Sequence, residues 1–311
     1  MRSRVLITTA LAGLLLTGLT TAEAAGRDSD VTRAFQATDR STPWSLVERV
    51  PLQFPTYHPQ GIAVVGDLIF LTSVEVLEAP AKYPVPVDGY DRTPGKGIGH
   101  LFVLDRQGHL KKDIRLADGT AYHPGGLDFD GKDLWVPVAE YRPNSRAVVY
   151  TVDPHTFKVT ERFRVRDHVG GLVRDRTTGL VHGVSWGSRT LYAWTPTGRQ
   201  VEKAANESHL LDYQDCDYAA RGKQLCGGVT TLPGPNNTTY DLGGLALLDL
   251  HTNRILHEIP FPYFSPTTNH SATRNPVHLE TTPTTLRLLT APDDGENPGG
   301  TELQTYEAPL S

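Results

Sequence analysis

The sequence predicts an all-β chain folded as a five-bladed β-propeller, and three observations carry this prediction. The composition is rich in turn residues, with 29 glycines and 23 prolines among 311 residues. Similar segments recur along the chain. Each recurring segment holds short apolar or mixed runs separated by turn residues, which is the pattern of a four-stranded blade. A propeller with six blades is the alternative fold.

The repeat opens each time with a short motif. Residues 58–66 read HPQGIAVVG, and residues 123–131 read HPGGLDFDG. Later copies begin at His168 and, 45 residues further along the chain, at Tyr213. A fifth copy begins at Asn275 with NPVHLETTP. In a repeat architecture of this kind, we expect each copy to open with the innermost strand of a blade.

Three further runs follow each opening motif and complete a blade. In the second copy they are DLWVPVAEY, AVVYTVDP and KVTERFRV. The fifth copy ends at YEAPLS without a fourth run, whereas the amphipathic segment SLVERVPLQ at 45–53 precedes the first copy. We expect this N-terminal strand to complete the last blade, because such closure leaves no open sheet edge. The propeller domain then covers residues 45–308, after a flexible segment at 26–44.

The first residues have the features of a secretory signal peptide. Two arginines in MRSR precede the apolar run VLITTALAGLLLTGLTT, and AEA follows it. This pattern predicts a signal peptide over residues 1–25, cleaved near Ala24 and Ala25, rather than a transmembrane anchor. We therefore expect a secreted, soluble and monomeric protein.

The two cysteines are expected to form a disulfide. Cys216 and Cys226 each lie five residues from Arg221, which is the centre of the expected turn between the first two strands of blade four. They would therefore face each other across an antiparallel hairpin, within disulfide reach. An exported protein favours the disulfide, and metal binding by the two cysteines is the alternative.

The charge of the chain argues against two classes of partner. The formal net charge is -5, and no long run of like charge occurs. Such a chain has no basic patch that would bind nucleic acid or an anionic membrane. We expect a small-molecule or glycan ligand instead.

Polar side chains are expected to gather at one end of the propeller axis. The start of the first strand and the end of the second share a face, because the two strands are antiparallel. The long connections 76–99, 233–241, 261–276 and 293–300 belong to the same face, and long loops usually carry function. The residues expected there are His58, His123, His168, Tyr213 and Asn275 from the first strands, and Glu75, Glu140, Trp186, Asp293 and Asp294 from the second strands.

The three histidines of this group suggest a metal site. Neutral imidazoles at equivalent positions of three blades can converge on one divalent cation and leave a position open for water or substrate. His58, His123 and His168 are therefore candidate ligands of zinc, calcium or manganese, with Glu75 or Glu140 as the candidate catalytic base. Two alternatives stay open: each histidine fixes its own blade, or the group binds a ligand without a metal.

The fifth copy departs from the repeat in its first strand. His278 occupies the position of Gly126, and Glu280 occupies that of Asp128. A polar group in a tight channel needs a partner, so we expect both side chains to face the channel. Glu280 becomes a third candidate catalytic residue, and the candidate ligand-binding residues are Tyr213, Asn275, His278, Asp128 and Trp186.

The segments HPQGIAVVGDLIFLTS, HPGGLDFDGKDLWVPVAE and HVGGLVRDRTTGLVHGV resemble the first hairpins of secreted bacterial propellers. These include the five-bladed glutaminyl cyclotransferases, the six-bladed lactonase and strictosidine-synthase-like groups, and an exported actinobacterial family. The resemblance spans residues 45–308 and implies the fold rather than an activity. Only HPQG at 58–61 approaches the start of a cyclotransferase blade, and a ring of histidines differs from the carboxylate and asparagine ligands of the calcium lactonases.

A secreted propeller with a polar, loop-rich face is expected to bind an extracellular ligand on that face. The enzymatic hypothesis is a metal-assisted hydrolase or lyase that acts on carbohydrate or cell-wall material. The alternative, from another functional class, is a propeller that recognises a glycan or a peptide without catalysis.

Overall fold

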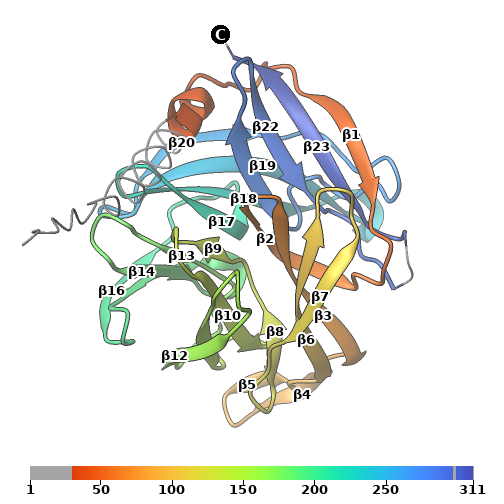
Figure 1. Cartoon of the computed structure of the whole chain (residues 1–311). Coiled ribbons are helices and arrows are strands. Elements are labelled where there is room, and N and C mark those ends of the chain that lie inside the picture. Colours follow the sequence, from red (N-terminus) through yellow and green to blue (C-terminus); the bar gives the residue numbers. More distant parts are fainter. Residues whose placement is uncertain (1–29, 297–298, 311) are drawn as a thin grey trace, which may run out of the picture.

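Five antiparallel sheets lie around a common axis in the computed structural model, which describes residues 30–296 and 299–310 (Figure 1). This arrangement confirms the predicted five-bladed β-propeller, and the alternative of six blades is wrong. The signal peptide predicted over residues 1–25 lies outside the described residues.

The blades follow one another along the chain. Blade 1 contains β2 (His58–Val65), β3 (Leu68–Glu78), β6 (Lys96–Asp105) and β7 (Leu110–Arg115). Blade 2 contains β8 (Ala121–Pro124), β9 (Asp128–Phe129), β10 (Leu134–Glu140), β11 (Ala147–Val152) and β12 (Val159–Val165). Blade 3 contains β13 (Gly171–Arg174), β14 (Val181–Val184), β15 (Thr190–Trp194) and β16 (Gln200–Ala205). Blade 4 contains β17 (Asp212–Ala219), β18 (Lys223–Pro233), β19 (Thr239–Asp249) and β20 (Ile255–Pro260).

The N-terminal strand closes the propeller, as predicted. Blade 5 contains β21 (Val277–Thr281), β22 (Thr285–Thr290), β23 (Glu302–Pro309) and, as its outer strand, β1 (Ser45–Pro51). β1 pairs antiparallel with β23, so the first and last strands of the chain share one sheet. The closure joins the two ends of the propeller and covers the edge of β23.

The hydrophobic core lies between neighbouring blades. Every residue of β10 is buried, because this middle strand is covered on both faces by adjacent sheets. The outer strand β12 of the same blade is mostly exposed. One core cluster joins Ala63 and Phe70 of blade 1 to Val136 and Val138 of blade 2. The stack of sheets around the axis therefore replaces a single central core.

Residues 30–44, which belong to the segment expected to be flexible at 26–44, pack on the propeller. Residues 30–36 are helical, and the side chains of Phe35 and Trp44 are buried in the core cluster of blades 4 and 5. His257 Nε2 of β20 donates a hydrogen bond to the Thr38 carbonyl oxygen (2.8 Å), because a carbonyl oxygen can only accept. Two large apolar side chains explain why this stretch packs on the propeller, because their burial favours order.

The long connections are more regular than the sequence suggested. Most of the connection at 76–99 belongs to extensions of β3 and β6 and to a small hairpin of β4 (Lys82–Val87) and β5 (Tyr90–Arg92). In the same way, β18 and β19 stay paired as far as Pro233 and Thr239, and the short 3₁₀ turn η2 (Pro235–Asn237) connects them. A second 3₁₀ turn, η1 (Trp186–Ser188), follows β14.

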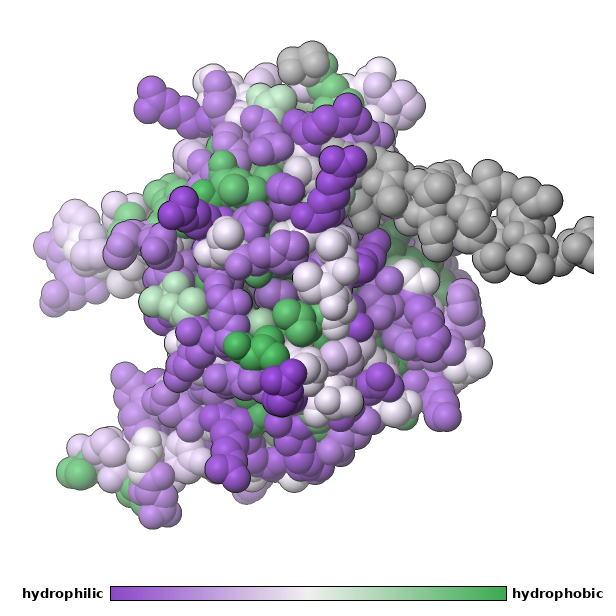
Figure 2. Space-filling view, turned by 90° about the vertical axis from the view of Figure 1, so that its left-hand side faces the viewer, coloured by the Kyte–Doolittle hydropathy of each residue, from purple (hydrophilic) through white to green (hydrophobic). Residues whose placement is uncertain are grey.

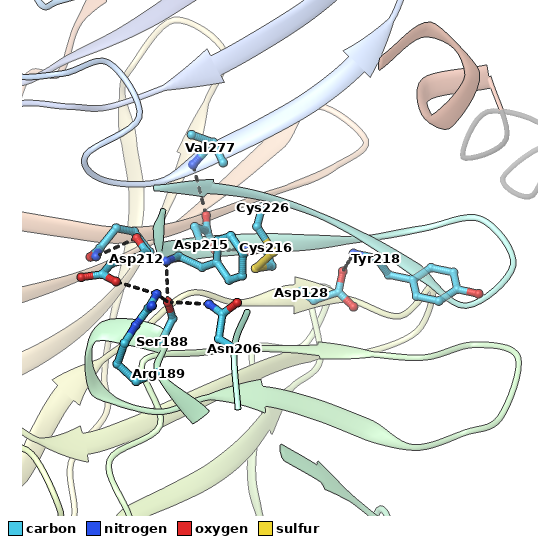
Figure 3. The surroundings of a disulfide bond; sticks show 12 residues. Asp128, Ser188, Arg189, Asn206, Asp212, Asp215, Cys216, Tyr218, Cys226 and Val277 are labelled. Carbon is cyan, nitrogen blue, oxygen red and sulfur yellow. Dashed lines mark hydrogen bonds and ion pairs between the residues drawn. A yellow bond between two sulfur atoms is a disulfide. The ribbon is translucent and has the colours of Figure 1, made fainter. Parts of the chain in front are cut away.

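The disulfide between Cys216 and Cys226 is present as predicted. The two residues face each other in the β17–β18 pair, with their Cα atoms 4.1 Å apart. Arg221 and Gly222 form the turn between them, both with positive φ. The disulfide holds the inner strand of blade 4 against its neighbour close to the axis (Figure 3).

A buried carboxylate fills the middle of the axis. Asp215 of β17 accepts hydrogen bonds from the backbone N–H groups of Ile62 (2.9 Å) in blade 1, Val277 (3.3 Å) in blade 5 and Cys216 (3.1 Å) in its own strand. Figure 3 shows the contact to Val277. A Cβ on Gly126 would lie 2.6 Å from Asp215 Oδ1, so only glycine fits there.

Asp128 of blade 2 makes the complementary links. Its two carboxylate oxygens accept hydrogen bonds from the backbone N–H groups of Arg174 (2.9 Å) in blade 3 and Tyr218 (3.2 Å) in blade 4. Asp215 and Asp128 together therefore connect inner strands of all five blades.

The Asp215 contacts divide the axis into two ends. Ile62 lies between His58 and the turn at Gly66 in blade 1, and Val277 lies between Asn275 and His278 in blade 5. We call the end where the inner strands begin the loop end, and the end where they finish in short turns the turn end.

The exposed surface is mostly polar. Figure 2 shows one side of the molecule, on which hydrophobic residues occur only in small separate groups. Among the described residues, no helix is long and apolar enough to cross a membrane.

Candidate functional site

Side chains from four blades meet at the loop end. They come from β2, β5 and β8, from the residues just past β10, β14 and β22, and from the segments before β13 and β21. We call this group the loop-end site, and its members are His58, Arg92, His123, Tyr141, His168, Trp186, Arg274 and Asp294.

A histidine and an aspartate form the most polar part of this site. His58 Nδ1 lies 2.6 Å from Asp294 Oδ1, and the His58 side chain is 23% exposed. An ionised carboxylate only accepts hydrogen bonds, so Nδ1 carries the proton. In the neutral imidazole, Nε2 then holds a lone pair. This arrangement gives His58 the form of an oriented general base.

Asp294 is held in its ionised form. The Arg274 guanidinium contacts its carboxylate at 3.3 Å. Burial alone would raise the pKa of Asp294. The neighbouring His58 and Arg274 lower it by more than burial raises it, so the net pKa lies well below the usual value. Asp294 therefore stays negative at neutral pH and fixes the His58 ring.

Tyr141 lies at the centre of the loop-end site. Its ring stacks on His123, with the centroids 4.2 Å apart, and is 5.8 Å from the Trp186 ring. Burial and the charge of Asp294 raise the pKa of its hydroxyl, against the opposing effect of Arg274. The Tyr141 hydroxyl therefore remains protonated and available as a donor.

The other two histidines of the site are buried and neutral. His168 Nδ1 lies 2.9 Å from the Glu140 carbonyl oxygen, which makes Nδ1 the donor, and burial lowers the pKa of His168 to about 4. His123 Nδ1 is buried and meets no hydrogen-bond partner within the described part of the chain. Burial also holds the pKa of His123 well below its usual value, with a further contribution from His168 and His58.

The three predicted metal ligands therefore share one end of the axis but have different environments. The rings of His123 and His168 are 5.7 Å apart, and His58 is paired with Asp294. Among residues 30–296 and 299–310, no group of three or more His, Cys, Asp or Glu side chains is arranged to hold a metal ion. A divalent metal at His58, His123 and His168 stays a prediction.

Glu75 and Glu140 lie near the loop end, but each belongs to its own network. Glu75 Oε2 is 3.4 Å from His100 Nε2 and 3.8 Å from Arg115. Glu140 is buried, and its oxygens accept hydrogen bonds from Arg142 (2.7 Å), Arg146 (3.1 Å) and Thr120. Burial raises the pKa of Glu140, but these donors keep the net value below the usual one. Both carboxylates are engaged with cations rather than with His58.

The predicted ligand-binding residues of the loop end divide into two groups. Trp186 is half-buried beside Tyr141, and the Arg92 guanidinium lies 5.4 Å above its ring. Asn275 is buried, with Nδ2 3.5 Å from Asp294 Oδ1. Tyr213 instead packs in the hydrophobic cluster of blades 3 and 4. Its side chain therefore does not join the loop-end site.

The structure separates the remaining predicted residues from this group. Asp128, His278 and Glu280 line a cavity at the turn end. His278 and Glu280 both face that cavity, but on the opposite side of Asp215 from His58. The candidate residues predicted for one site therefore occupy two ends of the axis.

Sequence reasoning missed Tyr141, Arg92 and Arg274. Tyr141 follows Glu140 directly, so it is one residue beyond the second-strand position that the sequence analysis considered. Asp294 was expected on this face but not as the partner of His58. Arg92 comes from β5, and its contact with Trp186 of another blade has no signal in the repeat.

The chain matches one family along almost its whole length. The profile of a family of unknown function (DUF6454) covers residues 23–310. No curated protein matches the sequence.

Solved structures are similar in fold. The tail fibre of Staphylococcus aureus phage P68 has 11% identity and a TM-score of 0.51, over 90% of this chain and 56% of the fibre chain. The Neurospora crassa Pan2 WD40 domain has 13% identity and a TM-score of 0.42, over 88% of this chain and 97% of that domain. A luciferin-regenerating enzyme has 11% identity and a TM-score of 0.44, over 85% of this chain and 95% of the enzyme.

These similarities concern architecture alone. At 11% identity the tail fibre supports the propeller fold but no activity. This chain spans about half of that fibre chain. The likeness to glutaminyl cyclotransferases and lactonases stays a prediction from the sequence.

Proposed function

This chain belongs to the family of unknown function (DUF6454), and we propose that it binds an acidic carbohydrate at the loop-end site and cleaves it as a lyase. One observation carries the proposal: the 2.6 Å contact between His58 Nδ1 and Asp294 Oδ1 on a partly exposed imidazole. A base oriented in this way is what proton abstraction from carbon requires.

The proposed step is a β-elimination on a sugar acid. His58 Nε2 takes the proton from the carbon next to the substrate carboxylate. The electron pair of that C–H bond forms a C=C bond, and the C–O bond to the neighbouring sugar breaks. The leaving oxygen takes a proton from the Tyr141 hydroxyl. The products are one unsaturated sugar acid and one sugar with a free hydroxyl group.

The cations of the site support an acidic substrate. Negative charge develops beside the substrate carboxylate as the proton leaves, and a nearby guanidinium stabilises it. Arg274 lies against Asp294 and Arg92 lies over Trp186, and both guanidinium groups are close enough to Tyr141 to lower the pKa of its hydroxyl. The Tyr141 and Trp186 rings offer apolar faces for a sugar ring.

The placement of the glutamates argues for a lyase over a glycoside hydrolase. Hydrolysis of a glycoside normally uses two carboxyl groups on either side of the bond. Glu140 is buried among Arg142 and Arg146, and Glu280 lies at the turn end. Neither therefore forms such a pair with Glu75.

Turnover of acidic polysaccharides tests the lyase proposal. Polygalacturonate, alginate and hyaluronan are incubated with the full chain, and the new C=C bond is followed by its ultraviolet absorbance. We expect His58→Gln to lower the rate on the active polymer by about 100-fold or more. His109→Gln is the matched control, because His109 also pairs with an aspartate (Asp105, 3.1 Å) but lies outside the site.

Two outcomes would contradict the lyase. One is the absence of unsaturated product from all three polymers. The other is full turnover in the His58→Gln variant, which would remove the base from the mechanism.

A recognition propeller is the second candidate function. The half-buried Tyr141 and Trp186 rings favour it, because aromatic faces bind sugars without any chemistry. In this case the wild-type chain binds a polysaccharide in calorimetry without cleaving it. Trp186→Ala then weakens binding, while His58→Gln leaves it unchanged. Turnover by the wild-type chain would reject this candidate.

We also propose that the protein works outside the cell. The disulfide between Cys216 and Cys226 supports this location, because oxidising compartments preserve such bonds. Detection of the chain, cleaved near Ala24 and Ala25, in the culture medium of its host tests the proposal.

A further inference from the structure

A cavity opens at the turn end of the axis. Its volume is about 490 Å³, which is within the range of small-molecule sites. The ends of the inner strands of four blades form it, and Val31 of the N-terminal helical segment lines it as well. Much of its wall is apolar, with side chains such as Val64, Leu225 and Leu279.

An oriented histidine lies in this cavity. His278 Nδ1 is 2.9 Å from Asp217 Oδ2, so Nδ1 donates to the carboxylate and Nε2 lies on the other side of the ring. Burial lowers the pKa of His278, but the Asp217 carboxylate raises it, and the net pKa is above the usual value. His278 is therefore more readily protonated than His123 and His168, whose pKa burial lowers.

An arginine and a glutamate lie near this histidine. Arg106 is 3.9 Å from Glu280, which is longer than a hydrogen bond, and the two side chains are 39% and 32% exposed. Both lie close enough to His278 to influence its pKa, in opposite directions. The Arg106 guanidinium is therefore able to contact a ligand without losing a tight internal contact.

The other charged groups of the cavity are already engaged. Arg176 donates a hydrogen bond to the Phe129 carbonyl (2.7 Å) and lies 4.9 Å from the Tyr218 ring centroid. Asp128 accepts two hydrogen bonds from backbone N–H groups, and Asp215 below it is likewise satisfied by backbone. These groups shape the cavity rather than offer free donors.

With His278 protonated and Asp128 neutral, the charges lining the cavity sum to one positive charge. Arg106, Arg176 and protonated His278 are positive, while Asp217 and Glu280 are negative, and burial raises the pKa of Asp128 to about 7. Below that pH Asp128 is largely neutral. A ligand with a single negative charge would balance the group, and an apolar body would match the walls.

We infer that the turn-end cavity is a second ligand site, which binds a small organic monocarboxylate through His278 Nε2 and the Arg106 guanidinium. The apolar part of the ligand lies against Val64 and Leu279. Charge-assisted hydrogen bonds of this kind are stronger than neutral ones, so a neutral ligand of the same shape binds less well. This inference is independent of the lyase proposal, because the loop-end site lies beyond Asp215.

Calorimetry with hexanoate and its neutral analogue hexanamide tests the inference on the full chain. We expect saturable binding of hexanoate at pH 6, with hexanamide at least about 10-fold weaker, or 1.4 kcal/mol. His278→Gln and Arg106→Gln are each expected to weaken hexanoate binding by about 10-fold or more. Lys132→Gln is the matched control, because Lys132 is an exposed cation on the same face whose side chain is outside the cavity lining.

The pH dependence separates a contact with His278 from a loss of folding. Affinity for hexanoate falls as pH rises, because His278 loses its proton and Asp128, with its pKa near 7, gains a negative charge. Arg106→Gln keeps this dependence, whereas His278→Gln leaves only the smaller part that Asp128 contributes. Urea unfolding of each variant shows whether the chain is still folded. Arg106→Gln is the variant that should disturb the fold least, because the Arg106 side chain is partly exposed.

Three results would overturn the inference. Equal affinity for hexanoate and hexanamide would remove the role of charge. Unchanged hexanoate affinity in a folded Arg106→Gln variant would remove the proposed contact. Absence of saturable binding by hexanoate, benzoate and octanoate would remove the site.

Discussion

The buried aspartates that link the blades and the partly exposed aspartate of the loop end act in opposite ways. In the middle and at the turn end, Asp215 and Asp128 are buried and accept hydrogen bonds from the backbone of other blades. At the loop end, Asp294 is 41% exposed and pairs with the side chains of His58 and Arg274. Asp215 and Asp128 therefore link blades, whereas Asp294 orients an imidazole, as Asp217 does for His278.

The difference follows from what surrounds each carboxylate. Inner strands converge on Asp215, and their N–H groups have no sheet partner on that side, so a carboxylate satisfies several blades at once. At the loop end the strands have diverged, and side chains from neighbouring blades meet instead. Substitutions at the two ends should therefore separate stability from function.

The largest loss of stability is expected for Asp215→Ala. The change leaves the N–H groups of Ile62, Val277 and Cys216 without their acceptor, and each buried unpaired donor costs about 1 to 3 kcal/mol. We expect the free energy of unfolding to fall by roughly 3 kcal/mol or more. Urea unfolding measures it, with Asp67→Ala in an exposed turn as control. A loss below that of the control would refute the role of Asp215 in joining blades.

Loss of the disulfide is expected to have the next largest effect. Cys216 and Cys226 close a short loop in the strand pair that carries Asp215, and the chain-entropy estimate for such a loop is about 2 to 3 kcal/mol. The double variant Cys216→Ser, Cys226→Ser should lose that amount in urea unfolding. Addition of a reductant should destabilise the wild-type chain but not the variant. Equal stability of the two chains without reductant would contradict this expectation.

Stability is also expected to depend on pH, through Asp128. Burial raises the pKa of Asp128 to about 7, above its ordinary value of 3.8. The folded chain then holds a proton that the unfolded chain releases, so the contribution of Asp128 to stability is fully present below pH 4 and is lost as pH rises through 7. Asp215 shifts in the same direction, for the same reason of burial.

Asp128→Asn isolates this part of the pH dependence. We expect urea unfolding between pH 4 and 8 to show a shallower decline for the variant than for the wild-type chain. Because an asparagine side chain offers one acceptor oxygen in place of two, the variant is also less stable at every pH. Parallel pH curves for the two chains would argue against a raised pKa.

The smallest effect on stability is expected at the loop end. His58 is partly exposed, and Asp294 keeps its contact with Arg274 when the imidazole is removed. His58→Gln should therefore change the free energy of unfolding by no more than roughly 0.5 kcal/mol. A loss comparable to that of Asp215→Ala in thermal or urea unfolding would mean that His58 holds its blade, as one of the sequence alternatives suggested.

The repeat predicted the fold because blade motifs are local. Each copy carries its own strands and turns, and the hairpin around Arg221 places Cys216 opposite Cys226 by residue count alone. The closing strand at 45–53 was visible for the same reason, since the fifth copy lacked a fourth run. Phe35 and Trp44 lie outside the repeat, so the repeat carries no signal that they are buried, and the segment before β1 was expected to be flexible.

The membership of each site could not be read from the repeat. Equivalent sequence positions predict equivalent heights along the axis, but they do not say which way a side chain points. Tyr213 has the same position in its repeat as His123, and yet it packs between blades. His278 lies only three residues after Asn275, but on the other side of Asp215. Pairs such as His58 with Asp294 join residues far apart in the chain.

The sequence by itself determined five blades, their closure and the disulfide, because periodic strands and turns depend on neighbouring residues. The tertiary structure alone decided that Asp215 closes the axis and that the polar candidates fall into two sites. These outcomes depend on which backbone N–H groups and side chains five converging strands bring within hydrogen-bond distance, and that distance is set by packing rather than by spacing along the chain.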